Sequence, residues 1–510
     1  MDAQSQPTMQ PGIVDTLVAR VWALVKQYRV CILVTLLAGL AAHLFFLSHK
    51  ITSYDDPLTS YGVDIASGRW GLRVLRWLVP PFSMPWFNGL VTLVLTAIST
   101  SLTVQILNIR RPLGQALVSA VVVTSALYVS LFCHMATSTP YALAIVLTTL
   151  AAHQFLAGGR RAWLVAALCL LGSLSIYQMY AALFVALLIV YASLHLLERG
   201  RLDTAATLRQ GASLAALLLV TGGVYLLITW SLGGINSALT YGVGQSDAIP
   251  MTQRIIGAYV NFVKLFILGF AGIVNTPLSM VAHLALAAIM VITIGWLQWH
   301  RGGIVPVLCQ CLLLAVAMPL VVNCAQVAFK PSHLNTLTIY SFVAFYYLAV
   351  ALTERFDLSA RWHTYDITRV LLTLVVLSNI YYANRSYLKM QIAYNNAVAY
   401  YTGIATQVKQ QPQLWQGSKV ALVGKATEFM FDTDKAFGTN NIRGTESLIN
   451  HPYKRAPFVN QHLGFDVEVL NPMQCDSLAS DPRVKAMPVY PYNGSIQTID
   501  DIIVVKLGEQ

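Results

Sequence analysis

Two carboxylates and three arginines lie close together near the N-terminus, and their types and spacing suit group transfer. Asp55 and Asp56 are adjacent, and Arg69, Arg73 and Arg76 follow them at helical spacing. This spacing puts the three guanidinium groups on one face of a helix. A carboxylate can take a proton from an attacking hydroxyl, while cations stabilise a departing phosphate. The residues therefore suggest transfer from a phosphate-linked donor, and a lipid-linked donor would suit a site at a membrane surface.

The composition predicts that membrane-spanning helices position these residues. Of 510 residues, 56% are hydrophobic and only 11% are charged, whereas roughly 25% are charged in an ordinary soluble domain. Blocks without Asp, Glu, Lys or Arg reach the length of about 20 residues that a span needs. We predict eleven spans, near residues 30–47, 87–108, 113–133, 140–157, 162–178, 180–197, 211–232, 278–299, 304–324, 336–353 and 367–383. The predicted fold class is an α-helical polytopic membrane protein with additional interfacial helices and a small C-terminal α/β soluble domain.

Basic residues in short connections predict the orientation of the chain. The pairs Arg110-Arg111 and Arg160-Arg161 lie in connections on the same side as the N-terminus. Such residues are enriched on the cytoplasmic side of membranes. The N-terminus is therefore predicted to be cytoplasmic, and the odd number of spans places the tail outside.

Three segments follow from this topology. They are a cytoplasmic segment 1–29, a membrane domain 30–383 whose first outward loop is 48–86, and an outward soluble domain 384–510. The last of these should begin as a helix that continues out of the final span, and its short β-branched runs predict strands at 419–424, 466–470 and 502–507. Residues 253–275 are long enough to span the membrane, but Lys264 near their middle favours a helix that lies at the outer interface or re-enters.

On this topology, the outward loops of the membrane domain contain only four carboxylates: Asp55, Asp56, Asp64 and Asp247. Because Asp56 precedes Pro57, it also fits an N-cap followed by proline at the first helical position. Asp55 is therefore the better candidate for the base. We expect Asp64 and Asp247 to be solvated loop or helix residues, and Asp64 is also a candidate to line the cavity.

The arginines lie within a predicted amphipathic helix, residues 58–78, at the membrane surface. They could simply hold anionic lipid headgroups instead of a donor phosphate. A divalent cation on Asp55 and Asp56 is conceivable, because hard cations take carboxylate oxygens, but two ligands alone do not define a site. No CxxC or other metal-binding spacing is present, so the sequence requires no cofactor.

Five further polar residues at outward span ends could complete a cavity. Each has an interfacial anchor as its default interpretation. Lys330 is the strongest candidate among them for a donor phosphate, because it is the only strong cation in its loop. The five are His134, Tyr177, Gln178, Lys330 and His333.

Two motifs resemble a known family. The segment YDDPLTSYGVDIASGRWGLRVL carries the acidic pair and a GRW element at Gly68, Arg69 and Trp70, and SIYQMY occupies 175–180. Both are similar to the bacterial and phage O-antigen glucosyltransferases of the glucosyltransferase II group. These belong to the GT-C class of multispan enzymes, which have an acidic motif in the first external loop. The resemblance covers about 30–383 and leaves the tail from 384 without a counterpart.

The resemblance implies a GT-C-like fold and an activity. A hexose, with glucose favoured, would pass from undecaprenyl phosphate to O-antigen or a related lipid-linked polysaccharide. The reaction would occur on the periplasmic face of the bacterial inner membrane, with inversion at the sugar carbon and Asp55 or Asp56 as base. The implied partners are the lipid-linked donor and acceptor, membrane lipids, a flippase and a donor synthase, and no nucleic acid.

Two alternatives remain open at this stage. A transporter or flippase for a lipid-linked saccharide would show ionisable or broken-helix features near mid-membrane in two related halves. The sequence has neither internal repeats nor paired carboxylates within its spans. A GT-C transferase for another sugar, such as arabinose or aminoarabinose, or for lipid A as acceptor, fits the same residues.

Overall fold

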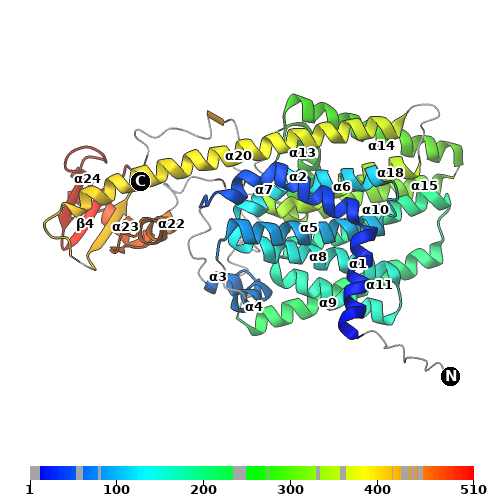
Figure 1. Cartoon of the computed structure of the whole chain (residues 1–510), viewed down its shortest axis with the longest axis horizontal. Coiled ribbons are helices and arrows are strands. Elements are labelled where there is room, and N and C mark those ends of the chain that lie inside the picture. The colour runs from blue at the N-terminus through cyan, green and yellow to red at the C-terminus, as the bar shows by residue number, and fades with distance from the viewer. Residues whose placement is uncertain are drawn as a thin grey trace, which may run out of the picture.

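The chain forms a bundle of long helices joined to a small α/β domain (Figure 1). The computed structural model describes residues 12–52, 61–78, 82–233, 249–270, 273, 275–301, 303–328, 334–356, 363–415, 417–426, 436–437, 442, 445 and 452–509. Helix α20 (Thr364–Lys409) runs the length of the bundle and continues into the C-terminal domain. The predicted fold class, a polytopic helical membrane protein with a small C-terminal α/β region, is confirmed.

Within the described residues, nine helices are long and apolar enough to cross a membrane. They are α2 (Arg29–Ser48), α5 (Pro85–Ile106), α8 (Met135–Ala157), η1 with α10 (Gln178–Arg199), α11 (Thr204–Ser231), α14 (Pro277–Arg301), α15 to α16 (Ile304–Val322), η4 with α18 (Thr336–Arg355), and α20. Helix α9 (Arg160–Ile176) has 17 residues and coincides with another predicted span.

The predicted span 113–133 is broken. It consists of α6 (Pro112–Thr124) and α7 (Ala126–Cys133), which are bent by 48°. Ser125 between them has an extended backbone, with ψ of 149°, and this conformation interrupts the helical hydrogen bonds. The prediction of an apolar segment here agrees with the two helices, which are together apolar enough for one span, but it did not include the bend.

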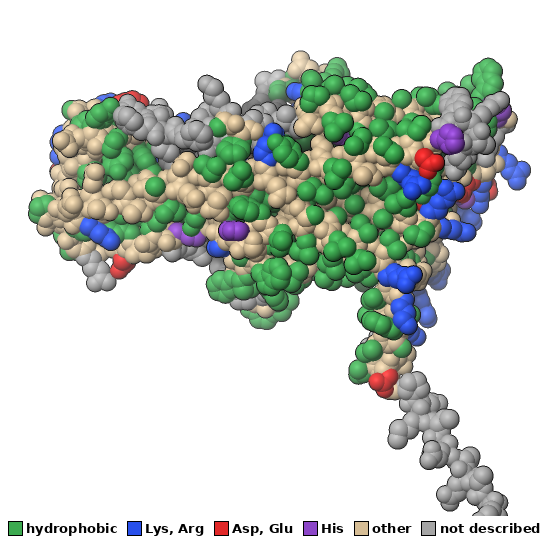
Figure 2. Space-filling view, turned by 45° about the horizontal axis from the view of Figure 1, so that its top comes forward, with side chains coloured by type: hydrophobic (Ala, Val, Ile, Leu, Met, Phe, Trp, Pro, Cys, Tyr) green, Lys and Arg blue, Asp and Glu red, His purple; other side chains and the backbone are tan. Residues whose placement is uncertain are grey.

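The outer surface of the bundle is largely hydrophobic, and its charges are distributed unevenly. Lys and Arg side chains gather at the end of the bundle that is opposite to the C-terminal domain (Figure 2). Helix α1 (Ile13–Gln27), an amphipathic helix that we did not predict, lies at this basic end and runs across the direction of α2 (Figure 1). Helix α13 (Met251–Ile267) packs against α14, α16 and α17 (Cys324–Ala328). Whether the segment 253–275 spans the membrane stays a prediction.

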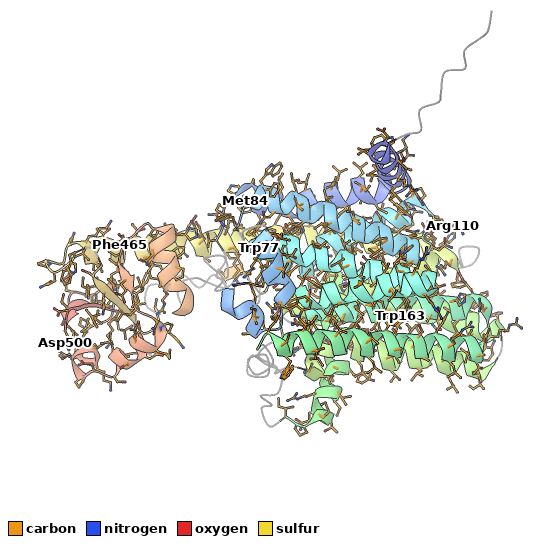
Figure 3. The ribbon with its side chains drawn as sticks, turned by 90° about the horizontal axis from the view of Figure 1, so that it is seen from below. Trp77, Met84, Arg110, Trp163, Phe465 and Asp500 are labelled. Carbon is orange, nitrogen blue, oxygen red and sulfur yellow. The ribbon has the colours of Figure 1, made fainter. Side chains whose placement is uncertain are left out.

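The first loop contains two short helices where we predicted one. Helices α3 (Tyr61–Ala66) and α4 (Trp70–Leu78) are separated at Gly68, whose φ is +74°. The Gly68 N–H donates to the Ile65 carbonyl and the Arg69 N–H donates to the Asp64 carbonyl, at 2.9 and 2.7 Å. This pattern is a Schellman motif, which ends a helix at a left-handed residue. Both helices lie at the end of the bundle that faces the C-terminal domain, as the position of Trp77 shows (Figure 3).

The C-terminal domain contains a four-stranded sheet. Its strands are β1 (Lys419–Val423), β2 (Glu468–Val469), β3 (Ile496–Ile499) and β4 (Ile502–Lys506), in the order β2-β1-β4-β3. Strand β1 is parallel to β2 and β4, whereas β3 is antiparallel to β4. The predicted strands coincide with β1, β2 and β4, and β3 was missed. The remaining elements are α22 (Pro452–Pro457), η5 (Phe458–His462), α23 (Pro472–Ala479) and α24 (Pro482–Ala486).

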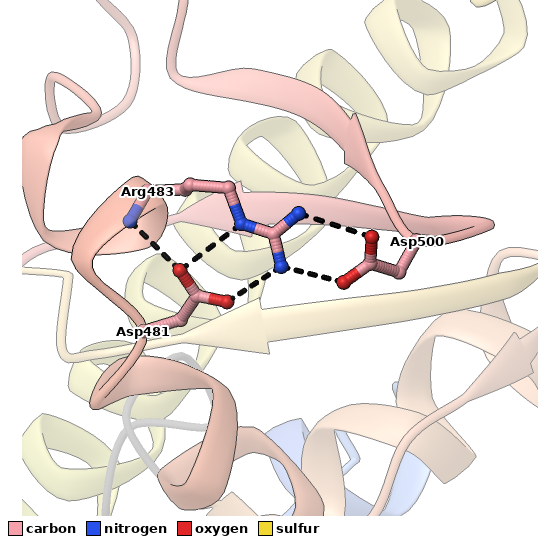
Figure 4. Close-up of polar contacts among 3 residues, drawn as sticks. All are labelled: Asp481, Arg483 and Asp500. Atoms are coloured by element: carbon pink, nitrogen blue, oxygen red, sulfur yellow. Dashed lines mark hydrogen bonds and ion pairs between the residues drawn. The ribbon is translucent and has the colours of Figure 1, made fainter.

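The hairpin between β3 and β4 is tied to α24 by one arginine. Asp500 and Asp501 both have positive φ, 48° and 64°, as a two-residue type I′ turn requires. Arg483 donates to both carboxylate oxygens of Asp500, at 3.0 and 2.5 Å, and also to Asp481, at 2.8 Å (Figure 4). Because the Arg483 and Asp500 side chains are exposed, the ion pairs fix geometry more than they stabilise the domain.

Candidate active site

Several predicted site residues lie outside the described residues. These are Asp55, Asp56, Lys330 and His333. The same is true of Asp247, the fourth carboxylate that was predicted to lie in an outward loop. The site is therefore built from the part of the first loop that resumes at α3 and from the helices that it contacts.

Asp64 and Arg76 form a buried ion pair between α3 and α4. The Arg76 Nη1 atom lies 2.6 Å from the Asp64 Oδ2 atom, and the two side chains are 6% (Asp64) and 3% (Arg76) exposed. Burial raises the pKa of the Asp64 carboxyl above its ordinary value, and the positive charges of Arg76, Arg69 and Arg73 offset this only in part. The expectation that Asp64 is solvated was wrong, because its partner arginine folds back from the next helix.

Arg69 faces a different set of groups. Its guanidinium lies 4.9 Å from the centroid of the Tyr177 ring, and its Nη1 atom is 3.4 Å from the Tyr141 hydroxyl. Tyr177 follows α9, and Tyr141 belongs to α8. All three arginines act electrostatically on Asp64. Arg76 is thus oriented by a carboxylate in direct contact, while Arg69 is oriented by cation–π contact with Tyr177 and by the Tyr141 hydroxyl.

Gln178 connects the turn between α3 and α4 to the bundle through hydrogen bonds. Its Nε2 atom donates to the Ser67 carbonyl at 2.8 Å and lies 2.7 Å from the Tyr225 hydroxyl. The Tyr225 hydroxyl in turn donates to the Gly68 carbonyl at 3.0 Å. The GRW element and the SIYQMY element, which are far apart in sequence, therefore meet here.

Two glycines permit this close approach. A Cβ atom at Gly68 would collide with the Tyr225 hydroxyl, and one at Gly71 would collide with the Ser175 side chain. Sequence reasoning missed Tyr225, because a tyrosine inside the apolar block of α11 gives no signal that distinguishes it from an anchor.

A row of tyrosines leads from Arg69 into the bundle. The rings of Tyr177 and Tyr180 are 5.1 Å apart, and those of Tyr180 and Tyr340 are 5.4 Å apart. The Tyr340 hydroxyl donates to the Tyr128 hydroxyl at 3.3 Å. Only Tyr177 was singled out from the sequence, although all four belong to the buried core.

His134 occupies the break between α7 and α8. Its Nδ1 atom donates to the Ser130 carbonyl at 2.7 Å, and the side chain is buried. This contact closes the end of α7. His134 therefore supports the backbone at a helix break, and a role in the cavity stays a prediction.

The C-terminal domain contacts the first loop just before the acidic pair. The Thr52 Oγ1 atom lies 2.7 Å from the His462 Nε2 atom, at the end of η5. Tyr394 on α20 contacts the same imidazole ring, with the ring centroids 6.2 Å apart. The tail, which had no predicted role, therefore reaches the loop that carries Asp55 and Asp56.

Within the described ranges, no group of three or more His, Cys, Asp or Glu side chains could hold a metal ion. The acidic pair lies outside those ranges, so a cation on Asp55 and Asp56 stays a prediction.

Taken together, the fold and the site define a polytopic helical membrane protein whose first loop brings arginines and a buried carboxylate against tyrosines of the bundle. A family model described as Glucosyl transferase GtrII matches residues 44–353, which is more than half of the chain, so the protein belongs to this glucosyltransferase family. The predicted family is confirmed, and the match includes both motifs. No curated protein and no solved structure matches the chain.

Proposed function

We propose that this glucosyltransferase moves a hexose, glucose by family, from a polyprenyl-phosphate donor to O-antigen or a related lipid-linked polysaccharide. The observation that carries the proposal is the arrangement of the first loop. The guanidinium of Arg69 is oriented against Tyr177, in the same loop that carries Asp55 and Asp56. Family membership argues against the transporter alternative.

The charge distribution supports a periplasmic site in the bacterial inner membrane. The basic end of the bundle is opposite to the C-terminal domain (Figure 2), whereas Trp77 of the first loop lies at the end that faces this domain (Figure 3). Basic residues are enriched on the cytoplasmic side of membranes. The loop and the C-terminal domain would then face the periplasm, where the donor is delivered by a flippase after a synthase makes it. Arg110 near one end and Met84 near the other mark the two sides (Figure 3).

In the proposed reaction, the Asp55 carboxylate takes the proton of the acceptor hydroxyl as its oxygen attacks the anomeric carbon. The bond between that carbon and the phosphate oxygen breaks, and the polyprenyl phosphate leaves with both bonding electrons. Attack opposite to the leaving group inverts the configuration. Arg69 and Arg73, with Lys330 as a further candidate, stabilise the charge that develops on the phosphate.

Arg76 has a positioning role in this scheme. Its guanidinium is paired with Asp64 at 2.6 Å, and the pair holds α3 against α4. The pair thereby fixes the turn that carries Arg69. Asp56, which precedes Pro57, is proposed as the cap of the following helix or as a second acidic group beside the base.

The Asp55→Asn variant tests the proposal. We expect a fall in kcat of roughly 10²- to 10⁴-fold, the usual contribution of a general base, with unchanged insertion and abundance. Transfer is measured in membranes that contain a polyprenyl-phosphate hexose and the acceptor, and Asp247→Asn is the matched control. Full activity of Asp55→Asn would remove this residue as the base, and a larger loss in Asp56→Asn would exchange the two roles.

The polysaccharide itself tests the substrates. Its mass in cells with and without the gene should differ by whole hexose units. A pentose or aminopentose difference, or a mass change confined to lipid A, would replace the proposed sugar or acceptor while leaving the transferase assignment intact.

A further inference from the structure

A second polar site lies at the basic end of the bundle, far from the first loop. A cavity of about 540 Å³ opens between α11 and the turn that joins α8 to α9. Arg160 is the first residue of α9, whereas Tyr177, which contacts Arg69, follows the last residue of that helix. The cavity and the candidate active site are therefore at opposite ends of the same helix. Trp163, which lines the cavity, lies in the half of the bundle that ends at Arg110 (Figure 3).

Two arginines line this cavity without any carboxylate among the lining residues. They are Arg160 from α9 and Arg209 from α11. Neither forms an ion pair with any residue in the described part of the chain, whereas Arg355 at the same end is paired with Glu198 at 2.7 Å. Two positive charges that converge on a cavity with no acidic neighbour favour an anionic ligand.

The backbone beside these arginines is open. Gly158 and Gly159 have φ of +74° and +85°, and no atom lies within 4 Å of a Cβ built on either residue. No side chain caps the start of α9. The first N–H groups of α9 are thus available as further donors next to the arginines.

Beside the arginines, Gln210 and Ser213 are the other polar side chains of the lining, and its other side chains are hydrocarbon. Phe155, Trp163 and Leu164 supply most of this hydrocarbon, and Leu164 is 57% exposed on the outer surface. Only 11% of the apolar window of α11 is buried inside the protein. Since α11 faces outward, the cavity opens sideways to the surface that lipid covers in a membrane.

We propose that this cleft binds one anionic phospholipid of the adjacent leaflet. The phosphate lies between Arg160 and Arg209, and an acyl chain follows Trp163 and Leu164. The chemistry matches in both parts, because the polar mouth is cationic and the wall is apolar. This lipid site does not depend on the proposed sugar transfer, and it is separated from the first loop by the length of α9.

Lipid binding to the purified full-length protein tests the proposal. Native mass spectrometry would compare phosphatidylglycerol with phosphatidylcholine of the same acyl chains, for the wild type and for the Arg160→Gln/Arg209→Gln double variant. We expect the wild type to prefer phosphatidylglycerol by about tenfold and the double variant to lose most of that preference. The preference should also weaken as the salt concentration rises.

A matched double variant controls for general loss of charge. Arg161→Gln/Arg20→Gln removes two exposed arginines that do not line the cavity, and it should keep the wild-type preference. Ser213→Phe, which narrows the cleft without changing charge, should lower binding of both lipids.

Three outcomes would overturn the proposal. They are equal phosphatidylglycerol binding by the wild type and the Arg160→Gln/Arg209→Gln variant, equal binding of the two lipids by the wild type, and full competition by glycerol phosphate, which would indicate a site for a soluble anion. Elution of each variant as a single species in size-exclusion chromatography separates lost binding from lost folding.

Discussion

The arginines at the two ends of the helix bundle differ in burial and in the partners that they contact. At the first loop, Arg76 is buried against Asp64, and Arg69 lies against Tyr177. At the other end, Arg160 and Arg209 are exposed and line an open cleft. Contacts with fixed partners hold Arg76 and Arg69 in a defined direction, which suits the proposed reaction, in which Arg76 positions the turn and Arg69 meets the phosphate. An exposed arginine adapts its side chain, which suits binding of a mobile lipid.

Substitution of Arg76 should lower the free energy of unfolding much more than substitution of an arginine at the other end, and this is the largest effect that we expect. Arg76→Ala leaves the buried Asp64 carboxylate without its partner at 2.6 Å, and breaking such a pair costs about 3 kcal/mol. Arg160→Ala at the other end removes an exposed side chain and should change the free energy of unfolding by less than about 0.5 kcal/mol. Thermal unfolding in detergent measures both variants.

The double variant Asp64→Asn/Arg76→Met is the control for this comparison. It removes both charges and should recover most of the lost stability, because no buried charge is left unpaired. Equal unfolding temperatures of Arg76→Ala and Arg160→Ala would contradict the contrast between the two ends.

A methyl group at Gly68 should have the next largest effect. Gly68→Ala adds both the strain of a positive φ and a collision with the Tyr225 hydroxyl. Gly233 has the same φ of +74° but no atom within 4 Å of its Cβ position, so Gly233→Ala isolates the strain of about 1 kcal/mol. We expect Gly68→Ala to cost roughly twice as much and to lower sugar transfer, as measured by unfolding temperature and by initial rates.

Tyr225→Phe should relieve part of the Gly68→Ala defect, since it removes the colliding oxygen. A defect in Gly68→Ala that is no greater than that of Gly233→Ala would show that the contact does not hold the loop.

The acid limb of the pH–rate profile should report Asp64. Because burial raises its pKa, acidification protonates Asp64 and breaks the pair with Arg76 at a pH at which an exposed aspartate is still ionised. Acidification should therefore lower the reaction rate, whereas its effect on the stability of the folded state through this group has the opposite sign. Since the folded state binds this proton more tightly than the unfolded chain, the group's contribution to stability is complete below the ordinary carboxyl pKa and is lost as the pH rises through the raised value.

The Asp64→Asn variant tests this assignment. Its acid limb should move to lower pH, into the ordinary carboxyl range, even if its maximal rate falls. An acid limb that stays in place would assign the limb to another group.

The contact between Thr52 and His462 should have the smallest effect. His462→Ala and Thr52→Val each remove one partner of the 2.7 Å contact, and each should lower sugar transfer by a few fold through looser placement of the loop. The double variant should be no worse than the single variants, because both remove the same interaction. Additive losses would show that the two residues act separately.

The sequence predicted the spans well because their signal is local and strong. Long apolar blocks coincide with α2, α5 and α10, for example. The break at Ser125 was missed, because a serine in an apolar run is equally common in unbroken helices. Strand β3 was missed as well, since a four-residue strand in SIQTIDD resembles a loop.

The candidate site was only partly predictable for a different reason. Its residue types and approximate location followed from charge counting, but its contacts are long-range. Asp64 was expected to be solvated, because nothing in the sequence says that α4 folds back onto α3 after Gly68. The meeting of Gln178, Tyr225 and Gly68 depends on how α9 and α11 pack, which no local pattern encodes.

The length of α20 has a mechanical consequence. Its 46 residues extend for about 69 Å at 1.5 Å per residue, more than twice the roughly 30 Å of a bilayer core. The buried side chains of the same helix belong to two cores, with Leu372 and Val375 in the bundle and Tyr401 and Val408 in the C-terminal domain. A force on the C-terminal domain would therefore be transmitted along a single continuous helix into the membrane bundle.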